Sequence, residues 1–172
     1  MLTTYSSMHG LPFEELMAIY QEGNRENGAI LAPFDTEARQ IQLAEQDFYE
    51  YLQGTFFKIP GVLYAIWWEG KKAVSALRLE PYRDGLLLEA LETEPSQRGK
   101  GYGASLICTV QELLASRGFI RLYSHVNKQN QPSLRVHTHC GFQIAADYAV
   151  YVDGSVNSQT YTLKFEKNEN PT

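Results

Sequence analysis

A glycine-rich loop between a short apolar run and an amphipathic segment constrains this chain most. The loop spans residues 97–103 and has glycines at alternate positions, Gly99, Gly101 and Gly103. Glycines leave backbone N–H groups unobstructed, so such a loop can wrap around phosphate oxygens, and a following helix adds its positive dipole end. The apolar run 86–93, stopped by Pro95, predicts a buried strand, and apolar residues recur at helical spacing up to Gly118. The sequence therefore predicts a strand–loop–helix unit with a diphosphate site.

Length and charge limit the class of protein. A chain of 172 residues suits one domain, which we expect over residues 1–166, followed by a frayed tail at 167–172. Hydrophobic residues make up 44% and charged residues 20%, as in ordinary globular proteins. The formal net charge of -5 argues against nucleic acid or an anionic membrane as a partner.

The cysteines and the apolar runs indicate the compartment. Cys108 and Cys140 are the only cysteines, too few for a disulfide framework. Residues 1–10 lack the basic-then-apolar pattern of a signal peptide, and no apolar run is long enough to cross a membrane. We expect a cytoplasmic location.

The remaining segments predict a mixed α/β domain. Helices are expected at 13–20, with Pro12 in its first turn, at 35–52 with Asp35 or Thr36 as cap, and at 131–139. Strands 61–68 and 73–79 should form a hairpin, residues 82–85 a turn, and 142–152 and 159–165 a final pair. Strand 120–126 should lie parallel to 86–93, because a long helix separates them. The expected architecture is a central mixed, mostly antiparallel sheet with one parallel pair and flanking helices.

The glycine loop alone does not identify a nucleotide-binding fold. A Rossmann loop requires a different glycine spacing and an acidic residue at the end of the next strand, where this chain has His125, Val126 and Asn127. A Walker loop requires Gly-Lys-Ser/Thr, and Lys100 is followed by Gly101. A tight strand-to-helix turn without a ligand remains the alternative.

A second motif makes the interpretation more specific. Asn130 is followed three residues later by Ser133, and then by Gly141 and Phe142. With Arg98, Gly101 and Gly103, which fit the pattern Gln/Arg-x-x-Gly-x-Gly/Ala, this motif resembles the GNAT superfamily of acetyl-CoA-dependent N-acetyltransferases. The resemblance covers residues 86 to about 142.

The resemblance implies an acyltransferase that moves an acetyl group from acetyl-CoA to a primary amine by direct attack, without a metal. The two parallel strands of this family splay apart and bind the pantetheine arm, and a backbone N–H near Glu92 or Thr93 would polarise the thioester carbonyl. Leu91, Thr93, Asn130 and Ser133 are the residues expected along the arm. The residues expected at the pyrophosphate are Arg98, Gly99, Lys100, Gly101, Tyr102, Gly103 and Ala104.

The reaction requires a proton acceptor, because an alkyl ammonium has a pKa of about 10. Glu89 and Glu92 lie on the strand beside the expected thioester, on opposite faces unless a bulge intervenes. Either carboxylate could instead point to solvent or pair with Arg78 or Lys71. His125, on the second splayed strand, is a further candidate because histidine titrates near neutrality.

The chain departs from the family pattern at His137, where many members have a tyrosine that protonates the departing thiolate. A protonated imidazole could replace the phenol as general acid, and the alternative is a half-buried helix histidine. His137 and His139 point in different directions on the expected helix, so no metal site is expected.

Other functions remain open at this stage. The chain could be a non-catalytic CoA-binding or sensory domain, or it could acetylate a protein N-terminus or lysine. The acceptor is thus a small-molecule amine or a peptide, and the late strands could pair across a homodimer. The acidic residues of segment 35–52, including Asp47 and Glu50, form either a solvated face or an attraction for a cationic acceptor.

Overall fold

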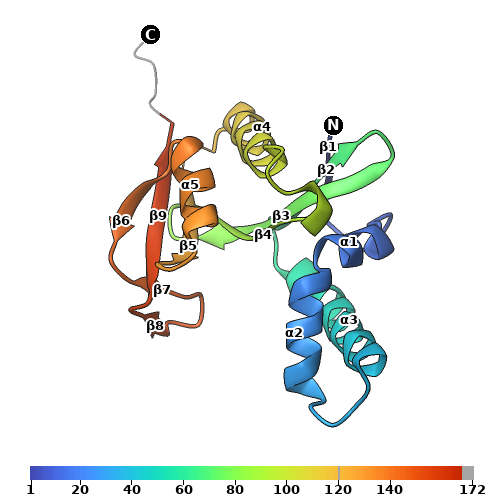
Figure 1. Ribbon diagram of the computed structural model, residues 1–172. Coiled ribbons are helices and arrows are strands. Elements are labelled where there is room, and N and C mark those ends of the chain that lie inside the picture. Colours follow the sequence, from blue (N-terminus) through green and yellow to red (C-terminus); the bar gives the residue numbers. More distant parts are fainter. Residues whose placement is uncertain (120, 168–172) are drawn as a thin grey trace.

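A seven-stranded twisted sheet forms the centre of the protein. The computed structural model describes residues 1–119 and 121–167. The strand order is β1-β2-β3-β4-β5-β9-β6, and β7 and β8 form a separate ribbon (Figure 1). Among the described residues, β4 and β5 are the one parallel pair, which confirms the predicted fold class. The strands are β1 (Leu2–Tyr5), β2 (Leu63–Glu69), β3 (Lys72–Tyr82), β4 (Gly85–Thr93), β5 (Arg121–Asn127), β6 (Gln143–Ala146), β7 (Ala149–Val150), β8 (Val156–Asn157) and β9 (Thr160–Glu166).

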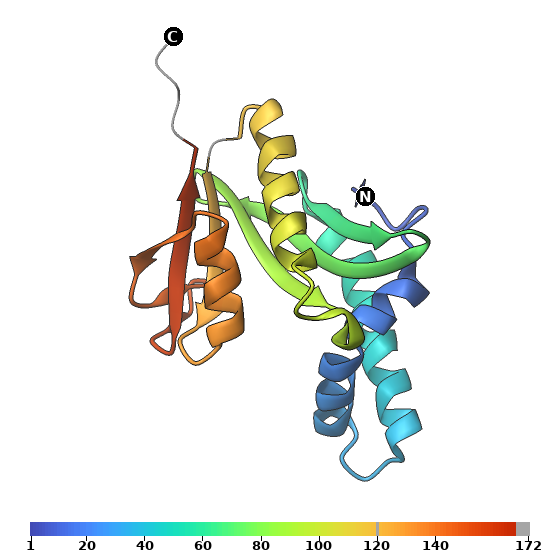
Figure 2. The same cartoon turned by 45° about the horizontal axis from the view of Figure 1, so that its top comes forward.

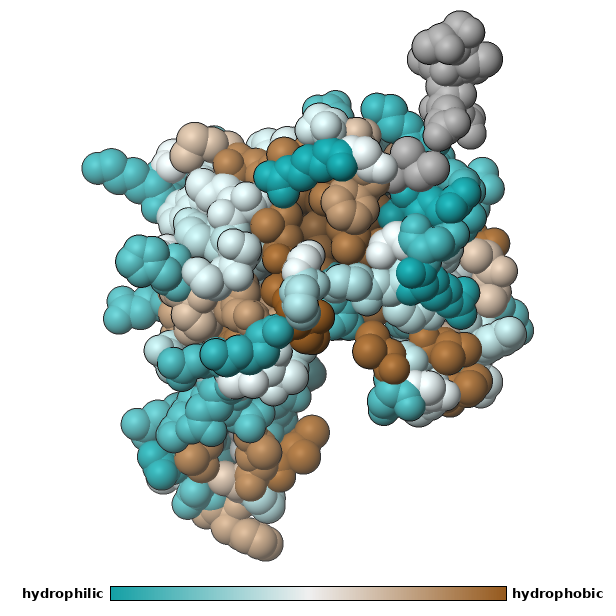
Figure 3. Space-filling model, turned by 180° about the vertical axis from the view of Figure 1, so that it is seen from behind, coloured by the Kyte–Doolittle hydropathy of each residue, from teal (hydrophilic) through white to brown (hydrophobic). Residues whose placement is uncertain are grey.

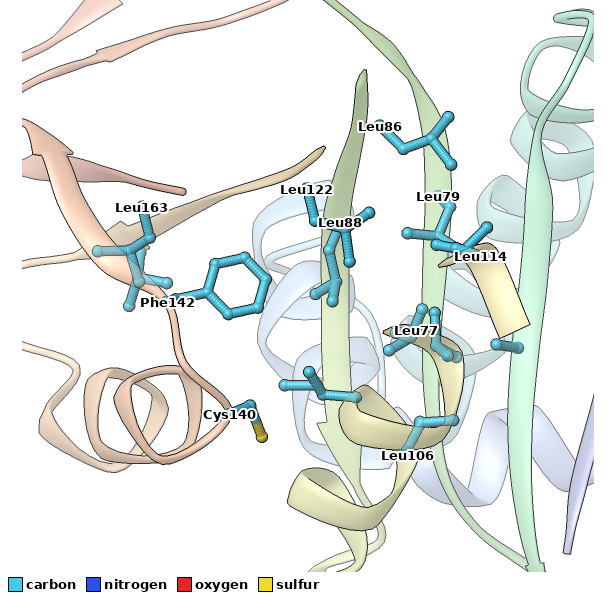
Figure 4. Packing of buried hydrophobic residues seen from close by; sticks show 14 residues of the cluster. Leu77, Leu79, Leu86, Leu88, Leu106, Leu114, Leu122, Cys140, Phe142 and Leu163 are labelled. Carbon is cyan, nitrogen blue, oxygen red and sulfur yellow. The ribbon is translucent and has the colours of Figure 1, made fainter. Parts of the chain in front are cut away.

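Helices cover both faces of the sheet. The helices α4 and α5 pack on one face, and α1, α2 and α3 gather on the other (Figures 1 and 2). Leucines of α4 interdigitate with leucines of β3 and β4 in the first core (Figure 4). The second core joins α1 and α3 to the opposite side of β2 and β3. The helices are α1 (Phe13–Ile19), α2 (Gln21–Leu31), α3 (Glu37–Gly54), α4 (Tyr102–Ser116) and α5 (Gln131–His139), with single 3-10 turns η1 (Phe56–Lys58) and η2 (Pro95–Gln97).

Local signals explain most of these boundaries. The Thr36 hydroxyl accepts a hydrogen bond from the Arg39 N–H and caps α3, as predicted. Gly118, at φ +84°, ends the last turn after α4, where its N–H donates to the Ala115 carbonyl. A Cβ on Gly85 would lie 2.4 Å from the Arg121 carbonyl oxygen, so only glycine lets β4 begin so close to β5.

The parallel pair is short. The two strands pair at Leu86 with Leu122, Leu87 with Tyr123, and Leu88 with Ser124, and they then diverge. Figure 2 shows β4 turning away from β5 toward α1 and α2. The edges of β4 and β5 beyond Leu88 and Ser124 therefore face a gap in the sheet rather than each other.

Several predictions were wrong in detail. Neither β1 nor α2 was predicted, and Pro12 is the N-cap of α1 rather than part of its first turn. The strand predicted at 142–152 breaks into β6, which pairs with β9, and β7, which pairs with β8. Residue 120 and most of the predicted tail, 168–172, lie outside the described residues.

Within residues 1–119 and 121–167, no helix has both the length and the hydrophobicity of a membrane span.

Candidate active site

A β-bulge in β4 lies where the two parallel strands separate. The register against β3 shifts between Ala76 and Arg78, and Ala90 takes the left-handed conformation at φ +51°. The Tyr20 hydroxyl donates a hydrogen bond to the Ala90 carbonyl at 2.7 Å, and the Tyr64 hydroxyl donates to that of Tyr20 at 2.9 Å. Burial raises the pKa of both tyrosines, so both remain neutral donors. Two buried hydroxyls thus stabilise the bulge that opens the gap.

The glycine loop leads to an uncapped helix start. Gly99 and Gly101 have φ of +77° and +83°, and a Cβ on either would meet no atom within 4 Å. No side chain caps α4, as is also the case for α1 and α2, whereas Thr36 caps α3 and Asn130 caps α5. The first-turn N–H groups of α4 are therefore open to an anion, and the two glycines leave open space beside them.

Arg98 anchors this loop to the sheet and to α2. Its Nε donates to the Thr93 carbonyl at 3.2 Å, and its guanidinium contacts Glu92 at 3.0 Å and Glu22 at 2.6 Å. The exposed Lys100 donates to the Gln97 side chain at 2.8 Å.

The other residues predicted to bind the cofactor lie on β4 and at the starts of α4 and α5. The Thr93 hydroxyl is 3.0 Å from that of Ser75, and Gly103 faces Thr93. Leu91 packs partly against the first core, as does Ala104, and Tyr102 is half-buried at the start of α4. The Asn130 side chain accepts a hydrogen bond from the Ser133 N–H at 3.1 Å, which caps α5.

The two glutamates predicted on β4 share one face of the sheet, contrary to the alternation expected for a regular strand. The bulge at Ala90 places two residues opposite one residue of β3, so Glu89 and Glu92 pair with Arg78 and Ala76, which lie on the same side. Glu89 is 3.6 Å from Arg78, and Glu92 is held by Arg98.

Glu80 completes a carboxylate pair that the sequence analysis missed. It lies on β3 diagonally opposite Glu89, since Glu80 pairs with Leu87 and Arg78 with Glu89. Glu80 is only 7% exposed, and burial together with the charge and hydrogen bond of Glu89 raises its pKa to about 7. The sequence contained a signal for this pair. A two-residue turn at residues 83 and 84 pairs Tyr82 with Gly85, and counting outward from that pair along both strands places Glu80 opposite Leu87, diagonal to Glu89.

The two predicted histidines lie on opposite sides of the sheet. On β5, His125 follows the buried Ser124, so the two side chains point to opposite faces of the sheet. His125 lines a cavity with Glu80 and Glu89, and its ring packs edge-on against the ring of Tyr151. Burial, assisted by the charge of Arg83, lowers the pKa of His125. Its Nε2 is buried without a partner among the described residues.

His137 is buried between α5 and the first core. It is 1% exposed, its Nδ1 is 2.8 Å from the Ser133 carbonyl oxygen, and its ring packs against Phe142. Burial lowers its pKa, so the imidazole is neutral near pH 7. With its proton on Nδ1, where Ser133 accepts it, the free Nε2 is an acceptor and not an acid. The structure therefore brings Glu89 and His125 together, and leaves Glu92 and His137 elsewhere.

Two cavities lie on the face of α1, α2 and α3. One of about 820 Å³ is bounded by α2, α3 and the bulge, and includes Tyr20, Tyr51 and Arg78. The other, of about 630 Å³, lies over β3, β4 and β5 and holds Glu80, Glu89 and His125. The described side chains include no group of three or more His, Cys, Asp or Glu arranged to hold a metal ion.

A model of the acetyltransferase (GNAT) family matches residues 16–142. The chain belongs to the GNAT acetyltransferase family. It is therefore an acyltransferase, and the match extends from α1 through the bulge, the glycine loop and α5 to Phe142. No curated protein sequence matches the chain significantly.

Solved GNAT structures share the fold over nearly the whole chain at low sequence identity. The paia N-acetyltransferase from Thermoplasma acidophilum, solved with coenzyme A, is 12% identical with a TM-score of 0.63, covering 97% of this chain and 99% of that one. The ribosomal-protein-S18-alanine N-acetyltransferase from Escherichia coli is 17% identical with a TM-score of 0.63, covering 100% and 99%. Aminoglycoside 6'-acetyltransferase type Ii is 14% identical with a TM-score of 0.66, covering 99% of each chain.

Proposed function

We propose that this GNAT acetyltransferase transfers the acetyl group of acetyl-CoA to a primary amine by direct attack. The observation that carries the proposal is the gap between β4 and β5, with an uncapped helix start and a carboxylate pair of which Glu80 is buried and Glu89 half-buried. Coenzyme A bound in this gap would present its pyrophosphate to the helix start and its thioester to the carboxylates. The solved relatives that contain coenzyme A support the choice of donor.

The cradle at residues 99–104 would hold the pyrophosphate through backbone N–H groups, with Gly99 and Gly101 leaving the space for it. Beyond the bulge, the edge of β4 toward β5 has no strand partner, and we assign its N–H groups to the pantetheine arm and the thioester oxygen. The Thr93 N–H donates to the Glu92 carboxylate at 3.1 Å and would exchange that partner for the ligand. Asn130 would act indirectly, by ordering the start of α5.

The acid–base chemistry follows from the carboxylate pair. The amine nitrogen bonds to the acetyl carbon, the carbon–sulfur bond breaks, and the amine loses a proton. Glu80 and its neighbour Glu89 are the groups we assign to accept that proton, directly or through water, because burial and the adjacent Glu89 raise the pKa of Glu80 to about 7. Since His137 is an acceptor at Nε2, we assign protonation of the thiolate to solvent.

Binding and turnover test the proposal together. Isothermal titration of acetyl-CoA should show micromolar affinity in the wild type and none in Gly101→Glu, whose side chain enters the cradle. Gly118→Glu is the matched control, since Gly118 has φ +84° and open space at the other end of the same helix. Thiol release with a panel of primary amines should then detect turnover. Absence of binding by the wild type would overturn the proposal.

The same experiments separate the alternatives. A sensory domain would bind acetyl-CoA and release no thiol with any amine or peptide. A protein acetyltransferase would prefer a peptide to every free amine. The raised pKa of the buried Glu80, which lines a cavity beside Glu89, supports catalysis, because strongly perturbed carboxyl groups in clefts are typical of acid–base sites.

A further inference from the structure

The two cavities on the acceptor side are neighbours that share one lining residue. Tyr51 of α3 lines both of them, with the bulge and Arg78 on one side and Glu80 and Glu89 on the other. Seen from behind, the surface is hollowed between the lobe of α2 and α3 and the lobe that carries β7 and β8 (Figure 3). Volumes of about 820 and 630 Å³ are in the range of small-molecule sites.

Negative charge is present at both ends of this pair of cavities. Asp47 and Glu50 line the first cavity, and Glu80, Glu89 and Asp153 line the second. Arg78 is the one lysine or arginine in these linings as far as the structure describes them, and it already contacts Glu89 at 3.6 Å and lies over the Tyr51 ring. No ion pair within residues 1–119 and 121–167 joins a basic side chain to the other four carboxylates.

The buried end independently indicates a cationic ligand. Glu80 is 7% exposed, faces the second cavity and has a second carboxylate as its neighbour. Two adjacent carboxylates are destabilising unless a proton or a cation lies beside them; Arg78 contacts Glu89, and no described ion pair involves Glu80. The His125 ring lines the same cavity and, because burial and the charge of Arg83 lower its pKa, it adds no positive charge there.

We propose that the acceptor is a small di- or polyamine, with the reacting amine at Glu80 and Glu89 and a second ammonium group at Asp47 and Glu50. This inference rests on the proposed function and names its substrate class. The side chains of Tyr20, Phe48 and Tyr51 line the first cavity, and their aromatic rings suit an alkyl chain that carries a cation at each end. Acetylation neutralises only the amine at the buried end, so the second ammonium remains a contact for substrate and product alike.

An isosteric pair of probes tests the second ammonium group. Cadaverine and n-hexylamine have the same length and differ in one terminal ammonium or methyl group. Thiol release should show a KM at least about tenfold lower for cadaverine, the effect of one charge-assisted contact. The double variant Asp47→Asn/Glu50→Gln should lose most of this discrimination, whereas Glu45→Gln, which removes a charge from α3 outside both linings, should retain it.

Direct titration distinguishes failure of the inference from failure of the proposed function. With CoA bound, the wild type should bind cadaverine more tightly than hexylamine, a result that needs no turnover. Equal binding and equal KM for the two amines, with acetyl-CoA binding intact, would overturn the inference alone. A basic peptide with a higher kcat/KM than cadaverine would also overturn it, and absence of acetyl-CoA binding would overturn both proposals.

Discussion

Replacing Tyr20 by phenylalanine tests whether the bulge in β4 depends on two buried hydroxyls. The substitution removes the donor to the Ala90 carbonyl and the acceptor of the Tyr64 hydroxyl, which belongs to a side chain with 0% exposure. The lost hydrogen bond contributes about 1 kcal/mol, and a buried polar group left without a partner costs about 1–3 kcal/mol more. We therefore expect the free energy of unfolding to fall by about 2–4 kcal/mol.

Tyr64→Phe is the matched control. It removes one donor, but the Tyr20 hydroxyl still donates to Ala90, so we expect a loss of only about 1 kcal/mol. Because Tyr20→Phe leaves the Tyr64 hydroxyl buried without a partner, removing that hydroxyl as well should make the double variant as stable as Tyr20→Phe or more stable.

Urea unfolding followed by tryptophan fluorescence measures these differences, since Trp67 and Trp68 lie on β2 within the sheet. A second readout is turnover: Tyr20→Phe should lower kcat more than it raises the KM for acetyl-CoA, because the bulge positions the edge of β4 and not the pyrophosphate cradle. The reasoning would be refuted if Tyr20→Phe were no less stable than Tyr64→Phe and turned over at the wild-type rate.

Three further predictions concern single positions. As the pH increases from about 4.5 to 7, the melting temperature of Glu80→Gln should rise relative to that of the wild type. Protonated Glu80 stabilises the wild type fully at low pH, and because its pKa is raised to about 7, this contribution is lost above about pH 7. A melting-temperature difference that does not change with pH would contradict this. Gly85→Ala should destabilise the protein far more than Gly54→Ala in thermal melts, since only at Gly85 does the new Cβ meet backbone, 2.4 Å away. Thr36→Ala should reduce the free energy of unfolding by about 1 kcal/mol in urea titrations, as expected for loss of a helix cap, and Thr36→Ser should restore most of it.

Local sequence signals predicted the elements whose stability is local. The cap at Thr36, the turns at residues 70–71 and 83–84, and the glycine-rich start of α4 each depend on a few adjacent residues, and their predicted positions are confirmed. The helix α2 has no such signal. It contains Gly23 and Gly28, both unfavourable inside a helix, and it forms because Gly28 lets it pack directly on the α3 backbone at Gln40.

The sequence by itself determined the fold class, the glycine-rich start of α4 and the placement of Glu89 and Glu92 on β4, because strand periodicity, glycine spacing and residue chemistry are properties of neighbouring positions. Only the tertiary structure decided which of these groups meet. Ala90 is not a residue that favours positive φ, and its bulge is stabilised by Tyr20, 70 positions away in the sequence. That bulge places Glu89 and Glu92 on one face, and cross-strand pairing brings Glu80 to Glu89, because long-range hydrogen bonds and burial select a conformation that local preference disfavours.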